Sequence, residues 1–502
     1  MVAVRTAAWV VLVAACGPTS PAKPDAFQFV GPGPGVVPGA PDRFLLLGTV
    51  VTPDTVLDGA VLVEGAQITC VDTADACAAL PGASGATIVN TAGIIAPGLV
   101  DTHNHILFDI FDGDDWLPAQ VYQDHDQWPN EARYKAMLDV KQCLADDSQG
   151  RPAWCAMTPY GSAAGSLRCE IDKWGELKGV IAGTTSIVGL PGTSGPCFGS
   201  LARSVDTAQS GLPTDKIQTS ALFPPSGGTG VCANVASGKT DAFLVHAGEG
   251  TDAKARGELA QLGSSTTPAN CLYAPQTAIT HGTAFTATEF AQMATAGMKL
   301  TWSPASNVAL YGATTDIPAA LDAGLTIALA PDWSMGGSQN LLDELRFAQQ
   351  WNASHWQDAR LSSQALVDMV TTNAAKVLAL DTQLGSLAVG HLADLAVFAG
   401  DPAAPYDAIV AARPTDVRLV MVGGVVQYGD ALLAQAGPGT CEPLDVCGAS
   451  KFLCAATASS ADKLDQTKVQ IESALQTALT LADSLTPDGF DFAPLAPLVR
   501  CP

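Results

Sequence analysis

The stretch "IIAPGLVDTHNH", Ile94 to His105, decides how the rest of this sequence is interpreted. It begins as an apolar run and ends in His103 and His105, although the chain of 502 residues contains only seven histidines. In a strand, side chains at i and i+2 point to the same side, with Cα atoms about 6.6 Å apart. Two imidazoles at this spacing can bind one metal ion, whereas the bland alternative is two unrelated surface histidines. We therefore expect a strand over 94–100 with a histidine pair at its carboxyl end.

Three more apolar runs end in polar residues of the same chemical kind. Phe243–Val245 is followed by "HAGE" (His246 to Glu249), Ala278–Thr280 by His281, and Leu325–Ala330 by Pro331 and Asp332. A single histidine after a strand is usually packing, and a single aspartate there often caps a helix. Barrel enzymes, however, build their active sites at the carboxyl ends of their strands. Four such ends in one chain predict a common site.

The middle of the chain alternates between short apolar runs and helical spacing. Thr286 or Thr288 starts a predicted helix that ends at Gly297, Leu341 begins another, and a third spans 362–380. This alternation predicts an α/β fold, a (β/α)₈ TIM-like barrel. Apolar runs on both flanks, at 44–47, 60–63, 394–398 and 417–426, predict short strands that form a small β-sandwich domain.

The resulting organisation has six parts. We predict a signal peptide over 1–15, a Pro/Gly-rich tether over 16–42, the two parts of the β-sandwich domain over 43–95 and 385–436, the hydrolase barrel over 96–384, and a cysteine-bearing C-terminal extension over 437–502. The extension contains one amphipathic helix around 463–485.

The N-terminus predicts export. Arg5 precedes a short apolar run, and Val13-Ala14-Ala15-Cys16 resembles a bacterial lipobox, so Cys16 is the expected lipidation site. Cleavage without a lipid is the alternative. We expect a lipoprotein in the periplasm or on the cell surface, with the lipid anchor as its only contact with a membrane. The other twelve of the 13 cysteines predict disulfides, with Cys70 and Cys77 as a local pair and four cysteines clustered in the tail.

Composition limits the class of partner. The formal net charge is −24, and the sequence contains no basic run. Phosphate binding requires clustered lysine and arginine, so composition argues against nucleic acid. A small-molecule substrate is the expected partner.

From about Phe44 to Gly429 the sequence resembles the amidohydrolase superfamily, in its adenosine-deaminase-like and triazine-hydrolase-like branch. The motifs that carry the resemblance are "PGLVDTHNH" (Pro97–His105), "HAGE" (His246–Glu249), "THG" (Thr280–Gly282), "SPASN" (Ser303–Asn307), "APDW" (Ala330–Trp333) and "GSLAVGHLADLAVF" (Gly385–Phe398). The resemblance implies one divalent metal held by His103, His105, His246 and Asp332, with His281 facing the substrate and Glu249 handling protons. The export signal, the cysteines, the 112–199 segment and the tail are atypical of the superfamily.

Such a site predicts hydrolysis of a non-peptide carbon–nitrogen bond, of the deaminase or cyclic amidase type. A metal-activated water molecule attacks an electrophilic carbon, with Asp332 as base and Glu249 as proton shuttle. His281 polarises the substrate or holds the water. Zinc is the expected metal, and iron and manganese also accept these ligands.

Two other functions remain open. A two-metal peptidase or prolidase-like enzyme requires a carboxylated lysine at a strand end, but Lys216 and Lys239 precede strands and Lys173 and Lys178 fall in a polar helical stretch. A non-catalytic surface binding lipoprotein is the second alternative.

Several remaining residues are interpreted as structural. His125 is expected to be a solvated loop histidine, although it could line the mouth of the site, and His355 and His391 are expected to be structural. Trp116, Trp128 and Trp333 would form either an apolar wall of the site or ordinary core.

Overall fold

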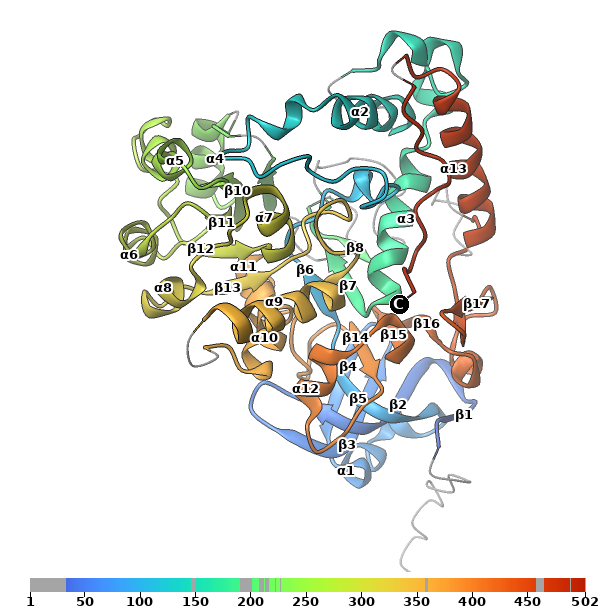
Figure 1. Ribbon diagram of the computed structural model, residues 1–502. Coiled ribbons are helices and arrows are strands. Elements are labelled where there is room, and N and C mark those ends of the chain that lie inside the picture. The colour runs from blue at the N-terminus through green and yellow to red at the C-terminus, as the bar shows by residue number, and fades with distance from the viewer. Residues whose placement is uncertain are drawn as a thin grey trace, which may run out of the picture. The chain divides into compact units, whose positions relative to one another are not determined.

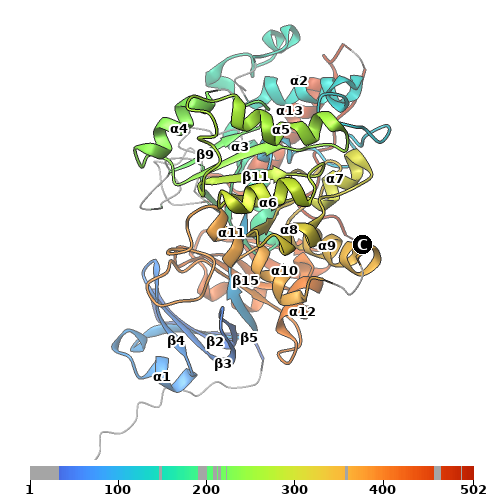
Figure 2. The same ribbon diagram turned by 90° about the vertical axis from the view of Figure 1, so that its left-hand side faces the viewer.

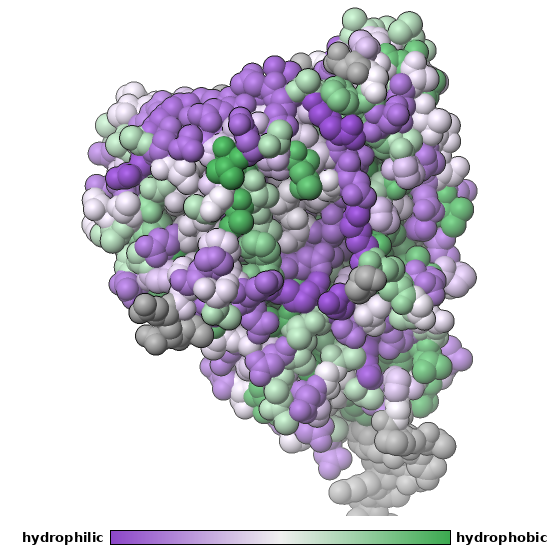
Figure 3. Space-filling view, viewed as in Figure 1, coloured by the Kyte–Doolittle hydropathy of each residue, from purple (hydrophilic) through white to green (hydrophobic). Residues whose placement is uncertain are grey.

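The computed structural model describes residues 33–145, 150–189, 201–206, 212, 216–221, 223–225, 227–356, 360–456, 465–487 and 489–501. Gly33–Pro502 form one compact unit. The predicted signal peptide, Cys16 and residues 17–32 of the predicted tether lie outside the described residues. Within the described ranges, no helix is long and apolar enough to cross a membrane. Figure 3 shows hydrophilic side chains in bands across one face, beside smaller groups of hydrophobic ones.

Both flanks of the chain build one mixed ten-stranded sheet. Its order is β17-β18-β16-β15-β14-β5-β2-β3-β4, and β1 pairs with β5. The strands are β1 (Gly35–Val37), β2 (Ala40–Val51), β3 (Val56–Glu64), β4 (Gln67–Asp72), β5 (Ala86–Pro97), β14 (Leu395–Phe398), β15 (Val417–Val422), β16 (Val425–Asp430), β17 (Glu442–Val446) and β18 (Ala449–Leu453). All pairs are antiparallel except β2 with β5. Apolar side chains from both flanks share one core, which includes Phe44, Val61 and Leu395.

Two predictions about this sheet need correction. Residues 35–37 and 40–42 were assigned to the tether, but they lie in β1 and at the start of β2. They are ordered in the sheet because β1 hydrogen-bonds to β5 and Val36 packs against the apolar core. The C-terminal extension also adds β17 and β18 to the same sheet, so it continues the flanking structure.

Eight parallel strands occupy the described part of the middle of the chain, in two groups. One sheet has the order β13-β12-β11-β10-β9 and the other β6-β7-β8. Their bounds are β6 (Leu99–Asp101), β7 (Thr184–Ile187), β8 (Arg203–Ser204), β9 (Ile217–Ser220), β10 (Ala242–Ala247), β11 (Thr277–His281), β12 (Lys299–Trp302) and β13 (Ile327–Leu329). A parallel bridge between Asn104 and Asp332 joins the segments that follow β6 and β13. The fold is therefore α/β with a TIM-barrel-like parallel sheet.

The predicted strand over 94–100 is divided at Gly98. β5 ends at Pro97 within the mixed sheet, and β6 begins at Leu99 and pairs with β7. A Cβ atom at Gly98 would lie 2.2 Å from Oγ1 of Thr185, so only glycine allows this close approach. One stretch thus passes from the mixed sheet into the parallel strands and delivers the histidine pair there.

The helices follow the strands, as α/β alternation requires. They are α1 (Ala74–Ala78), α2 (Ala132–Ala145), α3 (Arg168–Ile181), α4 (Gly228–Ala236), α5 (Ala253–Ser264), α6 (Ala287–Thr295), α7 (Pro304–Tyr311), α8 (Ile317–Asp322), α9 (Leu341–His355), α10 (Ser363–Met369), α11 (Thr372–Val377), α12 (Pro405–Ala411) and α13 (Lys468–Asp483). Helices α5, α6 and α8 lie on the outside of the β9–β13 sheet (Figures 1 and 2). Thr286 and Glu289 form a capping box at the start of α6, as its predicted N-terminus requires.

The single helix predicted over 362–380 is wrong. Two short helices, α10 and α11, occupy this range, because Thr371 has the non-helical dihedral angles φ −133° and ψ −97°. Val370 and Thr371 are both β-branched, which lowers their helix propensity.

The tail lies against the segment that follows the histidine pair. Helix α13 packs on α3, the indole N–H of Trp174 donates to the carbonyl of Ala496 at 3.0 Å, and the amide of Ala496 donates to the carbonyl of Ile110. Figure 1 shows α13 alongside α3. The extension therefore supports the region around the site.

Five disulfides join described cysteines: Cys70–Cys77, Cys143–Cys155, Cys232–Cys271, Cys441–Cys454 and Cys447–Cys501. The predicted local pair Cys70–Cys77 is confirmed, and the four clustered tail cysteines form two further bonds. Disulfides persist in oxidising compartments, so this set is consistent with export.

Candidate active site

The segments that carry the histidine pair and Asp332 are bound to each other through their backbones. The amide of Asp332 donates to the carbonyl of His103 at 3.1 Å, and the amide of His105 donates to the carbonyl of Asp332 at 2.7 Å. Oδ1 of Asp332 lies 2.8 Å from Nε2 of His103 and 3.4 Å from Nε2 of His105. Backbone pairing thus brings one carboxylate between two imidazoles, although His103 and Asp332 are 229 residues apart in sequence.

The ring of His246, near the end of β10, lies beside the ring of His103. Nδ1 of His246 lies 2.9 Å from the carbonyl oxygen of Ser220, which only accepts, so Nδ1 carries the proton. Nε2 is then an acceptor, and it is buried with no hydrogen-bond partner. The ring centroids of His103 and His246 are 4.7 Å apart.

His281, the last residue of β11, completes the cluster. Its Nδ1 lies 2.9 Å from Oδ1 of Asn307 on α7, and its ring lies 5.1 Å from that of His246. His281 and Asp332 have φ of 72° and 71°, in the left-handed region that residues other than glycine rarely adopt. Such backbone strain is often found at functional sites.

The clustered side chains are suited to a divalent metal. Ligand atoms of His103, His246 and His281 all lie within 4.8 Å of one another, as do those of His103, His105 and Asp332. Burial, followed by the neighbouring imidazoles, lowers the pKa of His103. Burial also lowers the pKa of His105 and of His246. The rings are therefore neutral, the form that binds metals, and the unpartnered Nε2 of His246 has the properties of a ligand atom.

Glu249 is buried beside this cluster. Its Oε1 accepts a hydrogen bond of 2.7 Å from the hydroxyl of Tyr311, and its Oε2 lies 3.9 Å from Nε2 of His281. The Tyr311 hydroxyl in turn accepts from the indole N–H of Trp128 at 3.0 Å. Glu249 therefore faces both His281 and a fixed donor, a position from which a carboxylate can move protons.

The comparisons with known proteins agree with this geometry. Residues 228–426 match the model of the "Amidohydrolase family". This protein is an amidohydrolase-family enzyme. The enzyme is 26% identical over 318 residues to a 5-methylthioadenosine/S-adenosylhomocysteine deaminase of Bacillus cereus, covering 60% of this chain and 72% of that protein.

Two solved structures share the fold of the enzyme. Atrazine chlorohydrolase from Arthrobacter aurescens TC1, complexed with zinc, aligns with a TM-score of 0.56 at 17% identity, over 80% of this chain and 97% of that one. An adenosine deaminase from Xanthomonas campestris with bound zinc aligns with a TM-score of 0.53 at 14% identity, over 89% of this chain and 100% of that one.

Sequence analysis missed Tyr311, although a signal for it exists. Asn307, within the quoted "SPASN", and Tyr311 are four residues apart on α7, so they lie on one face of this helix. Asn307 contacts His281 and Tyr311 contacts Glu249. The helix thus positions two site residues at once.

The three tryptophans turn out to be both wall and core. The ring centroid of Trp333 lies 5.2 Å from that of Trp128 and 5.8 Å from that of Trp116, and all three side chains are buried. The Trp333 ring is also 5.5 Å from that of His105. One side of the histidine cluster is therefore an aromatic wall, to which the 112–199 segment contributes Trp116 and Trp128.

The interpretation of His125 as a solvated loop residue is wrong. Its side chain is 16% exposed, and its Nε2 lies 2.8 Å from Oε1 of the buried Glu258. The loop is held inward because this ion pair and the Asp124–Gly250 bridge dock it on the turn after β10. His355 stacks on Trp351, and His391 hydrogen-bonds Ser386, so neither joins the cluster.

The lysines that a two-metal site would need lie elsewhere. Lys178 is buried in α3 and donates to Ser334 at 3.4 Å and to Gln339 at 3.2 Å. Lys173 is also buried in α3, so the predicted helical stretch is confirmed and its lysines are buried. Lys216 is paired with Asp241.

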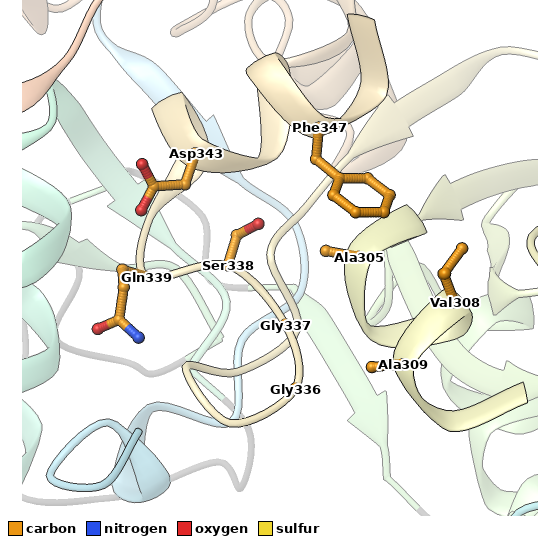
Figure 4. Close-up of a pocket in the computed structure, with 9 residues that line it drawn as sticks. All are labelled: Ala305, Val308, Ala309, Gly336, Gly337, Ser338, Gln339, Asp343 and Phe347. Carbon is orange, nitrogen blue, oxygen red and sulfur yellow. The ribbon is translucent and has the colours of Figure 1, made fainter. Parts of the chain in front are cut away.

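A pocket of about 410 Å³ lies beside α7, the helix that carries Asn307 and Tyr311 (Figure 4). It lies between α7, the loop 336–339 and α9, and Phe347 covers its apolar side. Glu344, one helical position after the lining residue Asp343, is fully buried and accepts from the amide of Ala305 at 3.1 Å. Burial raises the pKa of Glu344 to about 8.

Proposed function

We propose that this enzyme hydrolyses a non-peptide carbon–nitrogen bond with one bound divalent metal, as a deaminase or a cyclic amidase. The observation that carries the proposal is the buried, unpartnered Nε2 of His246, turned by the Ser220 carbonyl toward His103. Burial of an imidazole nitrogen without a hydrogen-bond partner costs free energy, and a bound ligand would offset that cost. A metal ion at this place would satisfy it.

We assign His103, His105, His246 and Asp332 as the ligands. A divalent metal held by this set would supply a Lewis acid that makes a water molecule more acidic. Zinc is favoured because both structures with this fold described above contain zinc, and iron or manganese would accept the same ligands.

Three residues would then handle the proton transfers. The carboxylate of Asp332, which lies beside the imidazoles of His103 and His105, would accept the proton of the attacking water. Glu249, held by Tyr311, carries a proton to the leaving nitrogen. Nδ1 of His281 donates to Oδ1 of Asn307, which leaves Nε2, 3.9 Å from Oε2 of Glu249, to orient the water.

The substrate class follows from the wall and the relatives. A planar ring would pack against the aromatic wall of Trp116, Trp128 and Trp333. The Bacillus cereus relative is named as a deaminase of 5-methylthioadenosine and S-adenosylhomocysteine. We therefore favour deamination of a heteroaromatic ring over opening of a cyclic amide.

We further propose that the eight parallel strands close into a (β/α)₈ barrel, with the mixed ten-stranded sheet from both flanks, 35–97 and 395–453, as the β domain. We also propose that the protein is an exported lipoprotein anchored through Cys16. The five disulfides support export.

A substrate screen with metal analysis tests the function. Purified protein is incubated with purines, pyrimidines, triazines, hydantoins, lactams and dipeptides, and its metal content is measured. Release of ammonia from a ring, or opening of a cyclic amide, at about one metal per chain supports the proposal. Dipeptide hydrolysis with two metals per chain would refute it.

A further inference from the structure

The turn that carries Glu249 is intrinsically loose. Gly248 and Gly250 flank Glu249 with φ of 67° and 149°, in conformations that favour glycine. Glycine loses more conformational freedom on folding than any other residue, so such a turn needs restraints if Glu249 is to have one position.

The first restraint is Glu258, on α5. Its Oε2 accepts a hydrogen bond of 2.7 Å from the amide of Gly248. The Glu258 side chain is 4% exposed. A buried carboxylate that accepts a backbone N–H makes a charge-assisted bond, which is stronger than one between neutral groups.

The second restraint is His125, from the 112–199 segment. Its Nε2 lies 2.8 Å from Oε1 of Glu258, so the carboxylate bridges His125 and the Gly248 amide. The charge of Glu258 is thereby compensated in a buried position, as buried carboxylates require.

The 112–199 segment also contacts the residues that follow Glu249. Asp124 and Gly250 form an antiparallel bridge, and the amide of Thr251 donates to the carbonyl of Gln123 at 2.8 Å. A Cβ atom at Gly250 would lie only 2.4 Å from the Gln123 carbonyl oxygen, so the segments are in close backbone contact. Both sides of Glu249 are therefore held.

We propose that Glu258, completed by His125, is a positioning residue that fixes the Glu249 turn for proton transfer. This inference rests on the proposed function of Glu249. A displacement of about 1 Å of a catalytic group can reduce the rate roughly 100-fold. Release of the turn should therefore lower kcat and leave KM and metal binding nearly unchanged, because the described hydrogen bonds of Glu258 go to His125 and to the Gly248 amide and not to the assigned metal ligands.

The test compares Glu258→Ala with Glu258→Gln in the full chain, with the substrate found by the screen. Glu258→Ala should lose roughly ten- to 100-fold in kcat at full metal occupancy, with KM within about threefold. Glu258→Gln keeps an oxygen that can accept from Gly248 and should recover most of that loss. The matched control is Asp394→Ala, because Asp394 likewise pairs with a cation, Arg203, and accepts from a glycine amide, that of Gly423. This control should retain wild-type kcat per folded, metal-loaded protein.

A double variant separates positioning from general loss of structure. If Glu258 acts through Glu249, adding Glu258→Ala to Glu249→Gln should leave the residual turnover unchanged. An additive loss, or loss of metal in Glu258→Ala, would overturn the positioning role. Should Glu258→Ala fail to fold, His125→Ala provides the same comparison, alone and combined with Glu249→Gln, and an additive loss there would overturn the role equally. Wild-type turnover in Glu249→Gln alone would instead refute the proposed function.

Discussion

The hydroxyl of Tyr311 donates a 2.7 Å hydrogen bond to Oε1 of Glu249, while the same oxygen of Tyr311 accepts from the indole N–H of Trp128. Burial, and then the charge of Glu249, raises the pKa of Tyr311, so the hydroxyl remains a donor. A residue from the 112–199 segment thereby orients a tyrosine on α7, which in turn orients a carboxylate after β10.

Tyr311→Phe should lower turnover without removing the metal. The change deletes one hydrogen bond to a charged group, which contributes about 1.5–3 kcal/mol. If this whole contribution is lost in the transition state, the rate falls roughly ten- to 100-fold. Steady-state kinetics and elemental analysis measure both effects. Tyr273→Phe is the control, because its hydroxyl donates to the Leu259 carbonyl on α5. Equal losses in the two variants would contradict a specific role of Tyr311.

Glu249→Gln and His246→Ala should fail in different ways. The glutamine is nearly isosteric but cannot shuttle a proton, so turnover should fall about 10²- to 10⁴-fold at full metal occupancy. His246→Ala removes the orphaned Nε2 and should lose metal first. Elemental analysis of both variants decides between the roles, and metal loss in Glu249→Gln would show that Glu249 is a ligand.

His281 distinguishes two possible ligand sets, because its ligand atom lies within 4.8 Å of those of His103 and His246. If His281 faces substrate and water, His281→Gln should keep about one metal per chain and lose activity. If His281 is a ligand, the same variant should bind metal more weakly, as seen by titration with a chelator. Retention of both metal and activity in this variant would exclude both roles for His281.

The His125–Glu258 pair makes stability depend on pH. Burial lowers the pKa of His125, but the Glu258 hydrogen bond and the charges of Glu249, Glu258 and Asp126 outweigh it and raise the pKa to about 9. Because the folded-state pKa lies above the ordinary value of 6.5, the stabilisation is fully present below pH 6.5 and is lost as the pH rises through about 9. The melting temperature of the wild type should therefore fall between these values by more than that of His125→Gln. Parallel curves for the two proteins would contradict the pair.

The disulfide Cys447–Cys501 should stabilise the fold more than Cys70–Cys77. The first bond spans 54 residues and the second spans 7. Loop-closure entropy then predicts about 4 kcal/mol against about 2.4 kcal/mol. Thermal unfolding of the two double Cys→Ser variants measures the difference. A larger loss of stability in the Cys70/Cys77 variant would show that strain or denatured-state structure, rather than loop length, decides how much each disulfide stabilises the fold.

Local sequence was sufficient to predict which histidines cluster. Alternation within a strand has a period of two, so the direction of His103 and His105 follows from their spacing. Buried parallel strands are short continuous apolar runs, and His246 and His281 stand at the ends of such runs. The start of the helix that follows Thr286 could also be predicted, because a capping box is a contact between residues three apart in sequence.

Tertiary packing decided what lies next to these residues. Tyr311, Trp128 and Glu258 act on Glu249 through contacts that span up to 183 residues, and no periodicity encodes such pairs. His125 looked solvated because a loop sequence does not show which turn it docks on. The division of the 94–100 strand at Gly98 likewise depends on the approach of Thr185, which only the assembled sheets reveal. Local preferences set the direction in which a side chain points, whereas its neighbours depend on which distant segments bury their apolar faces together.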